Sequence, residues 1–189
     1  AGPVAIGSFT TASAVAAGQR TGFVLLTSGA VWGWGSNQFG AAGTGTTSGV
    51  QLSPVQLANL SNIVAISTGL VNGYAIRNDG TNNRTLWGWG SNTSGQLGEV
   101  TTTGACRDYY SGRNRACQPT PLRIPGIDGV AALSAGGRHN LALKTDGRVW
   151  AWGDNAYGIL GDGTTIQRLR PAPVPGQCAG SLAGSKAQP

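Results

Sequence analysis

A short tryptophan-containing run occurs three times along the chain and constrains its fold more than any other feature. The run consists of tryptophan, a small residue, tryptophan and glycine. It accounts for all six tryptophans of the protein, which are Trp32, Trp34, Trp87, Trp89, Trp150 and Trp152. Aromatic side chains at a fixed point of a repeat are typical of core positions, so we interpret these six as structural markers of a repeated unit.

The sequences before the three runs also repeat in register. Each run is preceded by two short β-rich segments and a turn, which in the third unit are 130–134, 141–144 and Asp146-Gly147. An Asp-Gly pair between β-rich segments is a strong hairpin signal, because glycine readily adopts a positive φ. In the second unit we expect residues 81–85 to lengthen this turn.

A turn-rich tail and then a proline-led apolar segment follow each run. These segments begin at Pro54, Pro121 and Pro173. Because proline has no N–H to donate, each segment is expected to be an edge strand or irregular. Four strands per unit, with the units arranged radially, predict an all-β fold, a β-propeller of four-stranded blades.

The repeats also predict how the chain is divided. The expected parts are an N-terminal segment at 1–13, blade 1 at 14–62, blade 2 at 63–129 with an inserted loop at 99–118, blade 3 at 130–176, and a C-terminal tail at 177–189. Three blades are too few for a closed ring, which has four to eight. The sequence therefore predicts a partial propeller that other chains complete, with a fragment of a larger protein as the alternative.

The third unit resembles the repeat of the regulator of chromosome condensation family. The resemblance is carried by residues 135–161, which read Ala-Gly-Gly-Arg-His-Asn-Leu-Ala-Leu-Lys-Thr-Asp-Gly-Arg-Val-Trp-Ala-Trp-Gly-Asp-Asn-Ala-Tyr-Gly-Ile-Leu-Gly. The other two units have Thr21 and Asn72 in place of His139. Extended over residues 15–176, the resemblance implies a β-propeller, which in this family closes with about seven blades. It also implies a regulatory or scaffolding role, since nuclear members promote nucleotide exchange on a small GTPase and dock on chromatin.

The N-terminal residues match the outer strand of a blade without the inner strands that should precede it. These residues are Pro3, Val4, Ala5 and Ile6. We interpret them as a spare assembly strand that completes a blade of a neighbouring copy by strand addition. The alternative is the last strand of a missing upstream blade. Two arcs of three blades would form a ring, whereas a head-to-tail contact that does not close would form a filament.

The spacing of the three cysteines suggests a loop closed by a disulfide. Cys106 and Cys117 bracket ten residues and could pair as a disulfide, although Cys178 could take either partner instead. The bracketed segment contains Tyr and Arg residues, which anchor many interfaces, and we predict an interaction loop formed by Arg107, Tyr109, Tyr110, Arg113 and Arg115. The alternative is a surface loop that binds nothing specific. The cysteines and a first residue other than Met predict an extracellular or cell-surface location.

Charge and composition argue against several classes of function. The chain of 189 residues has a net charge of +6 from scattered bases, so nucleic-acid binding is not expected. His139, the only histidine, has no evident acid or nucleophile as a partner, which predicts no catalytic residue and no enzyme. No Cys/His cluster or apolar run of 18 residues is present, so no metal, cofactor or membrane span is expected. Asp154 and Asp162 could hold calcium, but a turn role is favoured.

These observations predict a non-enzymatic extracellular structural or adhesive β-propeller protein that self-assembles into a ring or filament. The expected partners are copies of the chain itself, with a surface protein or a glycan as further candidates. One alternative is a regulatory protein-interaction module of the guanine-nucleotide-exchange-factor type. Another is a carbohydrate-binding lectin, because exposed tryptophans stack on sugars.

Overall fold

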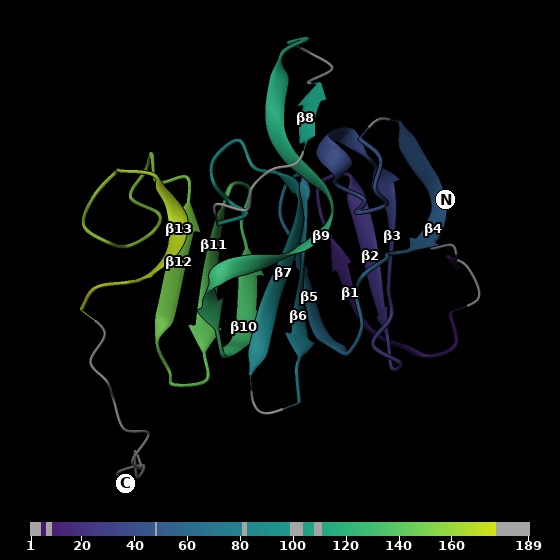
Figure 1. Ribbon diagram of the computed structural model, residues 1–189, viewed down its shortest axis with the longest axis horizontal. Coiled ribbons are helices and arrows are strands. Elements are labelled where there is room, and N and C mark those ends of the chain that lie inside the picture. Colours follow the sequence, from purple (N-terminus) through teal and green to yellow (C-terminus); the bar gives the residue numbers. More distant parts are fainter. Residues whose placement is uncertain are drawn as a thin grey trace, which may run out of the picture.

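The computed structural model describes residues 5–6, 9–47, 49–80, 83–98, 104–107 and 111–176 of the chain. These residues form three antiparallel sheets that lie side by side (Figure 1). Blade 1 has the strand order β1-β2-β3-β4, blade 2 the order β5-β6-β7-β9-β8, and blade 3 the order β10-β11-β12-β13. The prediction of an all-β partial propeller is confirmed.

The strands follow the repeat of the sequence closely. Blade 1 consists of β1 (Ala12–Ala17), β2 (Thr21–Leu26), β3 (Val31–Ser36) and β4 (Val50–Gln56), with the 3-10 turn η1 (Gln38–Gly40) after β3. Blade 2 consists of β5 (Ile63–Thr68), β6 (Asn72–Asn78), β7 (Arg84–Ser91), β8 (Gly104–Arg107) and β9 (Asn114–Asp128). Blade 3 consists of β10 (Val130–Ala135), β11 (His139–Lys144), β12 (Val149–Gly153) and β13 (Arg168–Pro173). The proline-led segments lie in β4, β9 and at the end of β13.

The turn of blade 2 is shorter than the sequence suggests. Arg84 and Thr85 belong to β7, where they pair with Asn78 and Arg77 of β6. Asp79 holds this end of the ladder together, because its carboxylate accepts hydrogen bonds from Thr85 Oγ1 at 2.8 Å and from Arg77 Nε at 2.6 Å. The extra residues of this unit therefore extend both strands as well as the turn.

A bulge lies at the second tryptophan of the run in every blade. The pairing of β7 with β9 shifts register between Gly88 and Gly90, and Gly90 has a φ of 99°. A Cβ atom at Gly90 would collide with the Val71 carbonyl oxygen. Glycine is required here because the backbone combines a left-handed conformation with a close approach of the neighbouring turn.

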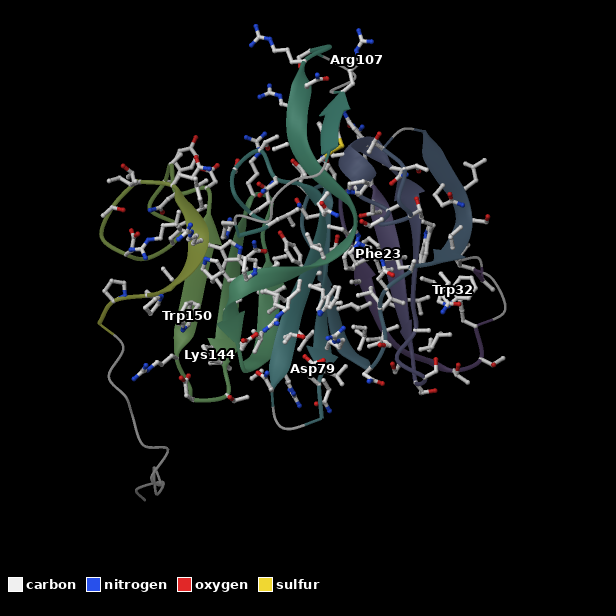
Figure 2. The ribbon with its side chains drawn as sticks, in the orientation of Figure 1. Phe23, Trp32, Asp79, Arg107, Lys144 and Trp150 are labelled. Atoms are coloured by element: carbon white, nitrogen blue, oxygen red, sulfur yellow. A yellow bond between two sulfur atoms is a disulfide. The ribbon has the colours of Figure 1, made fainter. Side chains whose placement is uncertain are left out.

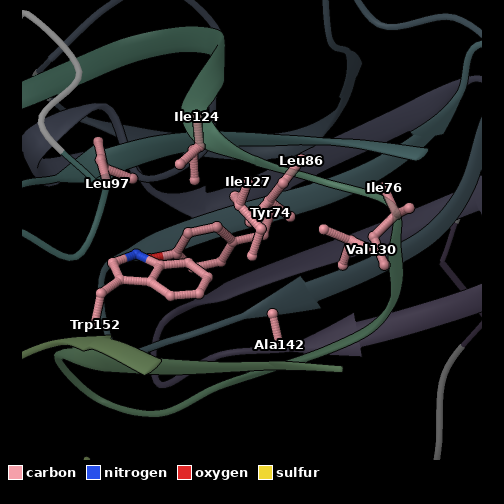
Figure 3. Close-up of a cluster of buried hydrophobic side chains, with 9 residues drawn as sticks. All are labelled: Tyr74, Ile76, Leu86, Leu97, Ile124, Ile127, Val130, Ala142 and Trp152. Carbon is pink, nitrogen blue, oxygen red and sulfur yellow. The ribbon is translucent and has the colours of Figure 1, made fainter. Parts of the chain in front are cut away.

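The hydrophobic core lies between blades. One cluster joins blade 1 to blade 2, and its buried members are Phe23, Leu25, Val31, Leu57, Leu60, Ile63, Ala75 and Trp89. The second joins blade 2 to blade 3 (Figure 3), and its members are Tyr74, Ile76, Leu86, Leu97, Ile124, Ile127, Val130, Ala142 and Trp152. Each member of the first cluster has its counterpart in the second, one blade further along. The repeat is therefore the unit of core packing as well as of sequence.

The second tryptophan of a run inserts into the preceding blade. Trp89 is fully buried, lies edge-to-face on Phe23 with ring centroids 5.4 Å apart, and donates its indole N–H to the Ala41 carbonyl oxygen at 3.2 Å. Trp152 is likewise buried and donates to the Gln96 carbonyl oxygen at 2.9 Å. These two side chains link the blades by both packing and hydrogen bonding.

The first tryptophan of a run is only half-buried, and Trp87 and Trp150 pack against the outside of the two core clusters. The Arg77 guanidinium lies over the Trp87 ring at 4.5 Å, and the Lys144 ammonium lies over Trp150 at 5.0 Å. Trp32 is covered by Phe9, at 5.6 Å between ring centroids. The side chains over these rings limit their use as open stacking platforms.

An asparagine shapes the tail that receives each inserted tryptophan. The side-chain oxygens of Asn37, Asn92 and Asn155 accept a hydrogen bond from the backbone N–H five residues later, at 3.1, 2.9 and 3.0 Å. The carbonyl groups that accept a tryptophan N–H, those of Ala41 and Gln96, come four residues after the asparagine. The asparagine therefore positions the acceptor for the next blade.

We predict that Trp89→Phe lowers the free energy of unfolding by about 1–3 kcal/mol, because it leaves a buried carbonyl without its donor and reduces the packed volume. The matched control is Trp34→Phe in blade 1. The Trp34 indole N–H has no acceptor within the described residues, so this variant should lose less than about 0.5 kcal/mol. Urea unfolding at a low protein concentration measures both values. Equal losses would contradict the assigned role of the indole hydrogen bond.

A second prediction concerns Asp162, whose hydrogen bonds stabilise its charged form. Its carboxylate accepts bonds from the Thr164 backbone N–H at 2.9 Å and the Thr164 hydroxyl at 2.8 Å, and pairs with Arg168 at 2.5 Å. These bonds, the Thr164 backbone bond first, lower the pKa of Asp162 from 3.8 to about 2. A lowered pKa stabilises the fold above pH 3.8, and this contribution disappears as the pH falls to about 2.

The difference in thermal midpoint between the natural protein and Asp162→Asn should therefore be largest above pH 3.8 and shrink between there and about pH 2. Differential scanning calorimetry across this range measures it. A difference that stays constant with pH would show that the charge of Asp162 does not contribute.

Candidate protein-binding face

A β-hairpin projects beyond the three sheets at one end of the molecule (Figure 1). Strand β9 is 15 residues long: its later part is the outer strand of blade 2, and its first part pairs with β8 from Asn114 to Cys117. The sequence predicts an inserted loop at 99–118, whereas the described part of this insertion is ordered by strand pairing. The described part of the insertion thus extends the sheet of blade 2.

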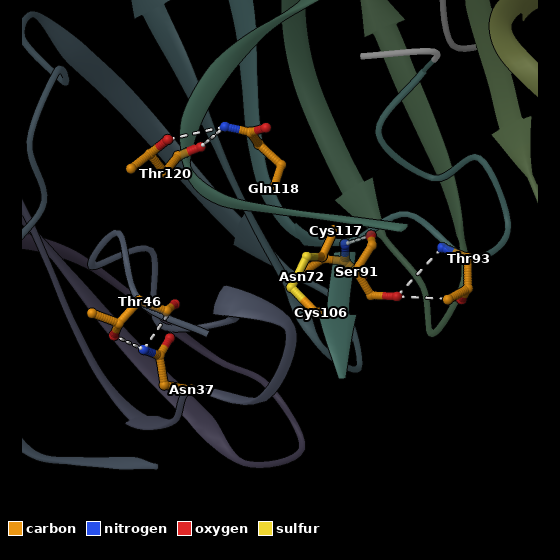
Figure 4. The surroundings of a disulfide bond; sticks show 9 residues. All are labelled: Asn37, Thr46, Asn72, Ser91, Thr93, Cys106, Cys117, Gln118 and Thr120. Carbon is orange, nitrogen blue, oxygen red and sulfur yellow. Dashed lines mark hydrogen bonds between the residues drawn. A yellow bond between two sulfur atoms is a disulfide. The ribbon is translucent and has the colours of Figure 1, made fainter. Parts of the chain in front are cut away.

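The base of the hairpin is anchored on blade 1. Cys106 and Cys117 are joined by a disulfide (Figure 4), with 5.9 Å between their Cα atoms. Both side chains are buried against Phe39. Backbone hydrogen bonds hold the base on both sides, from Gly45 N–H to the Pro119 oxygen at 3.0 Å and from Asn92 N–H to the Ala116 oxygen at 2.8 Å. Because Phe39 belongs to blade 1, the hairpin bridges two blades.

Three arginines extend from this hairpin. Arg107, Arg113 and Arg115 are all exposed, and Figure 2 shows Arg107 near the tip. Tyr109 and Tyr110, the aromatic residues of the predicted interaction loop, lie outside the described residues, as does Cys178. The role of the loop in binding remains a prediction, and its described part supplies positive charge.

A cavity of about 280 Å³ lies at the base of the hairpin, and a fourth arginine lines it. Its lining includes Arg115 from β9, Arg138 from the turn between β10 and β11, Phe39 from blade 1 and Gln96 from blade 2. Arg138 is exposed, and its guanidinium has no hydrogen bond or ion pair with any described residue. We call this end, with Arg107, Arg113, Arg115 and Arg138, the basic end. Sequence reasoning missed Arg138, because only the blade arrangement brings that turn to the hairpin.

Two ion pairs lie toward the opposite end of the molecule. Arg77 pairs with Asp79 at 2.6 Å, and Arg123 pairs with Asp128 at 2.8 Å through two hydrogen bonds. Figure 2 shows Asp79 and Arg107 at opposite ends. The Thr85 hydroxyl first, and then Arg77, lower the pKa of Asp79, which keeps the carboxylate charged. Ion pairs therefore neutralise two of the arginines at this end.

The remaining candidate residues have structural surroundings. His139 begins β11 and is half-buried beside Gly136. Asp154 accepts a turn N–H from Ala156 at 3.0 Å. Among the residues that the structure describes, no three His, Cys, Asp or Glu side chains group closely enough to hold a metal ion. Over the same residues, no helix has the length and apolarity needed to cross a membrane.

The structure describes only two of the four residues of the predicted assembly strand. Pro3 and Val4 lie outside the described residues, while Ala5 and Ile6 are exposed and belong to no strand. Ala5 and Ile6 pair with no described strand, and the proposed addition of the segment to a second copy stays a prediction.

These features define a β-propeller repeat protein whose fold is a protein-interaction module. The regulator of chromosome condensation (RCC1) repeat matches the chain over residues 28–70, 85–143 and 146–180, and a second form of the same repeat matches residues 12–41 and 130–159. The chain therefore belongs to the regulator of chromosome condensation family, as the resemblance of residues 135–161 predicts.

Relatives with known roles are much longer than this chain. The ultraviolet-B receptor UVR8 of Arabidopsis thaliana is 35% identical over 161 residues, which is 84% of this chain and 33% of that protein. The human probable E3 ubiquitin-protein ligase HERC6 is 32% identical over 162 residues, 83% of this chain and 14% of that protein. This chain thus spans a third or less of these relatives.

Solved structures show the same fold. Prp20p of Saccharomyces cerevisiae, studied for its binding to Gsp1p and histones, superposes with a TM-score of 0.74 at 22% identity and covers 87% of this chain and 38% of its own. Human WBSCR16 superposes with a TM-score of 0.67 at 25% identity and covers 89% of this chain and 39% of its own.

The predicted extracellular or cell-surface location is wrong. The RCC1-like relatives are nuclear or cytosolic regulators, which points to a location inside the cell. The prediction relied on a cysteine pair and on the first residue of the chain. A buried cysteine pair can serve local packing, as it does against Phe39 here, so it is weak evidence for a compartment.

We predict that the disulfide between Cys106 and Cys117 is present in protein isolated with its free thiols blocked. Both sulfur atoms are shielded from solvent, which limits access by a reducing thiol. Mass spectrometry after proteolysis without reduction should detect the two peptides as a linked pair. Alkylated thiols at both positions, or a link from either to Cys178, would contradict this pairing.

Proposed function

We propose that this chain is a non-enzymatic interaction module that binds an acidic surface of a partner protein through its basic end. The observation that carries the proposal is the anchored hairpin, which presents Arg107, Arg113 and Arg115. Of these, Arg115 lines a cavity together with Arg138. Arginine pairs with carboxylates through two parallel hydrogen bonds, which suits it to recognition of acidic side chains.

The anchoring of the hairpin favours binding. An interaction loop that is ordered before contact loses less conformational entropy when its partner arrives. Here the disulfide, the contact with Phe39 and the pairing of β8 with β9 order the backbone that carries the arginines. Arg138 adds a group from blade 3, so the surface joins side chains of two blades.

The relatives support a protein as the partner. Prp20p binds Gsp1p and histones, as reported with its structure. We therefore propose that a partner of one of these kinds is bound by this chain. A regulatory role of the guanine-nucleotide-exchange type would require binding to a Gsp1p-like GTPase, so the same experiment tests that alternative.

The experiment compares two double charge reversals of equal size. Arg107→Glu/Arg113→Glu changes the basic end, and the control Arg123→Glu/Arg148→Glu makes the same change in net charge away from it. Biolayer interferometry with immobilised Gsp1p and with core histones measures the dissociation constants at two salt concentrations. The hairpin variant should bind at least about tenfold more weakly, and the affinity of the natural protein should fall with rising salt.

The control variant should keep its affinity to within about twofold, because it alters exposed charges far from the contact. Equal weakening by the two variants would show that only net charge matters. Absence of binding to either protein would reject these partner classes.

Self-association into a ring or filament is a second candidate, but we do not place it outside the cell. The exposed Leu141 and Leu143 of β11 support it. A lectin function has less support, because Trp89 and Trp152 are buried and the first tryptophan of each run is covered.

A further inference from the structure

We infer that the cavity of about 280 Å³ at the base of the hairpin binds the phosphate group of a phosphorylated serine or threonine side chain of the partner protein. Its charged groups are Arg115 and Arg138, and its described lining residues all lie between Phe39 and Arg138, well away from both ends of the sequence. The inference rests on the proposed function, because it names the chemical group that this part of the basic end binds.

The lining of the cavity favours an anion. It includes Arg115 and Arg138, whereas no aspartate or glutamate is among its described residues. Arg138 is exposed, and its guanidinium has no hydrogen bond or ion pair with any described residue. Arg115 belongs to β9, where it pairs with Cys106 of β8 and therefore lies beside the disulfide. An anion with two charges is stabilised more strongly in this cavity than an anion with one.

The backbone that carries Arg138 is held in place. Its carbonyl oxygen accepts the Asp154 N–H at 3.0 Å, which ties the turn between β10 and β11 to the end of β12. The Gly136 N–H closes the same turn by donating to the His139 oxygen at 2.9 Å, and the His139 ring packs against Gly136. Because this backbone is already ordered, only the side chain of Arg138 loses freedom when a ligand binds.

The cavity also has neutral donors that the described residues leave available. The hydroxyl oxygens of Ser91 and Thr93 lie 3.2 Å apart (Figure 4), so one of their two hydrogens forms this bond and the other can reach a ligand. Gln96 is 1% exposed, and its Nε2 atom donates only one long bond, to Asn72 at 3.5 Å. A buried amide N–H without an acceptor is costly, and an anion in the cavity relieves that cost.

The number of donors favours phosphate over carboxylate. Two guanidinium groups, a hydroxyl pair and a buried amide line the same cavity. A carboxylate has two oxygens, which one guanidinium satisfies through two parallel bonds. A phosphate monoester has three such oxygens and a charge of about −1.5 to −2 at neutral pH. The phosphate therefore has acceptors for donors on more than one wall of the cavity.

The apolar part of the lining suits the carbon atoms of a phosphorylated side chain. It is formed by Phe39 of blade 1 and by Leu70 and Val71 of the turn between β5 and β6. Phe39 and Val71 pack together with the two cysteines of the disulfide. Inorganic phosphate has no apolar surface to bury against these residues, so a phosphorylated side chain should bind more tightly than the free ion.

The experiment titrates the isotope-labelled protein with four ligands at constant salt and follows the backbone amide signals by NMR. Three ligands are peptides of alanine and glycine that have phosphothreonine, glutamate or unmodified threonine at the centre, and the fourth is inorganic phosphate. The phosphothreonine peptide should shift the amide signals of Thr93, Ser94 and Gln96 to saturation. It should bind at least about tenfold more tightly than the glutamate peptide and at least about threefold more tightly than inorganic phosphate.

Two variants and a matched control test the contacts. Arg138→Gln should weaken binding of the phosphothreonine peptide at least about tenfold, and Thr93→Val about threefold, because each removes donors from the cavity. The control Arg148→Gln makes the same change in net charge at the other end of β11 and should keep the affinity within about twofold. All three side chains are exposed, so the variants should fold as the natural protein does.

Several results would overturn the inference. A glutamate peptide that binds as tightly as the phosphothreonine peptide would make the cavity a site for acidic side chains. Inorganic phosphate that binds as tightly would make it a site for the free ion. Absence of saturable binding by the phosphothreonine peptide, or equal weakening in the Arg138→Gln and Arg148→Gln variants, would show that the cavity does not recognise phosphate.

Failure of this inference is distinguishable from failure of the proposed function. Arg107 and Arg113 are not among the described lining residues, so the Arg107→Glu/Arg113→Glu variant should retain most of its affinity for the phosphothreonine peptide. A cavity that binds no phosphate, together with loss of Gsp1p or histone binding in that variant, would reject the phosphate site alone. Phosphate binding without any effect of that variant on these proteins would instead reject the proposed function.

Discussion

The structure depends on one contact, the insertion of a tryptophan from each blade into the blade before it. The indole supplies a large apolar surface, and its N–H satisfies a carbonyl group that no strand ladder can reach. The asparagine of the preceding blade sets that carbonyl in place, so the two parts of the contact lie in different repeats. A single blade therefore lacks a complete core, and its stability comes from its neighbours.

The organisation of function follows from the same arrangement. The ends of the strands and the turns lie at the margins of the blades, where side chains can change without disturbing the cores. Blade 2 uses this freedom to extend β9 into a hairpin, and blade 3 contributes Arg138 from a short turn. The surface of positive charge belongs to the arrangement of blades and to no single repeat.

The sequence predicted the blades well because their markers are local. Tryptophan runs, glycine turns and proline-led segments each impose a conformation within a few residues. The basic end was only partly predictable, because Arg138 reaches the hairpin through blade packing and β9 continues through a segment that reads as a loop. The repeat pattern also predicted the same structural role for all six tryptophans. Burial divides them into the fully buried Trp89 and Trp152 and the half-buried first tryptophans. Trp34 is the second tryptophan of its run, yet it is only half-buried.

Strand β9 has a mechanical consequence. Its first residues carry the hairpin, and further along the same strand Ile124 and Ile127 are packed in the core between blades 2 and 3. Between them β9 shifts register twice against β7, from Gln118 to Leu122 and from Arg123 to Asp128. Because bulges bend a strand, the hairpin and the core residues follow different directions along one strand, and the hairpin can be displaced without moving the core.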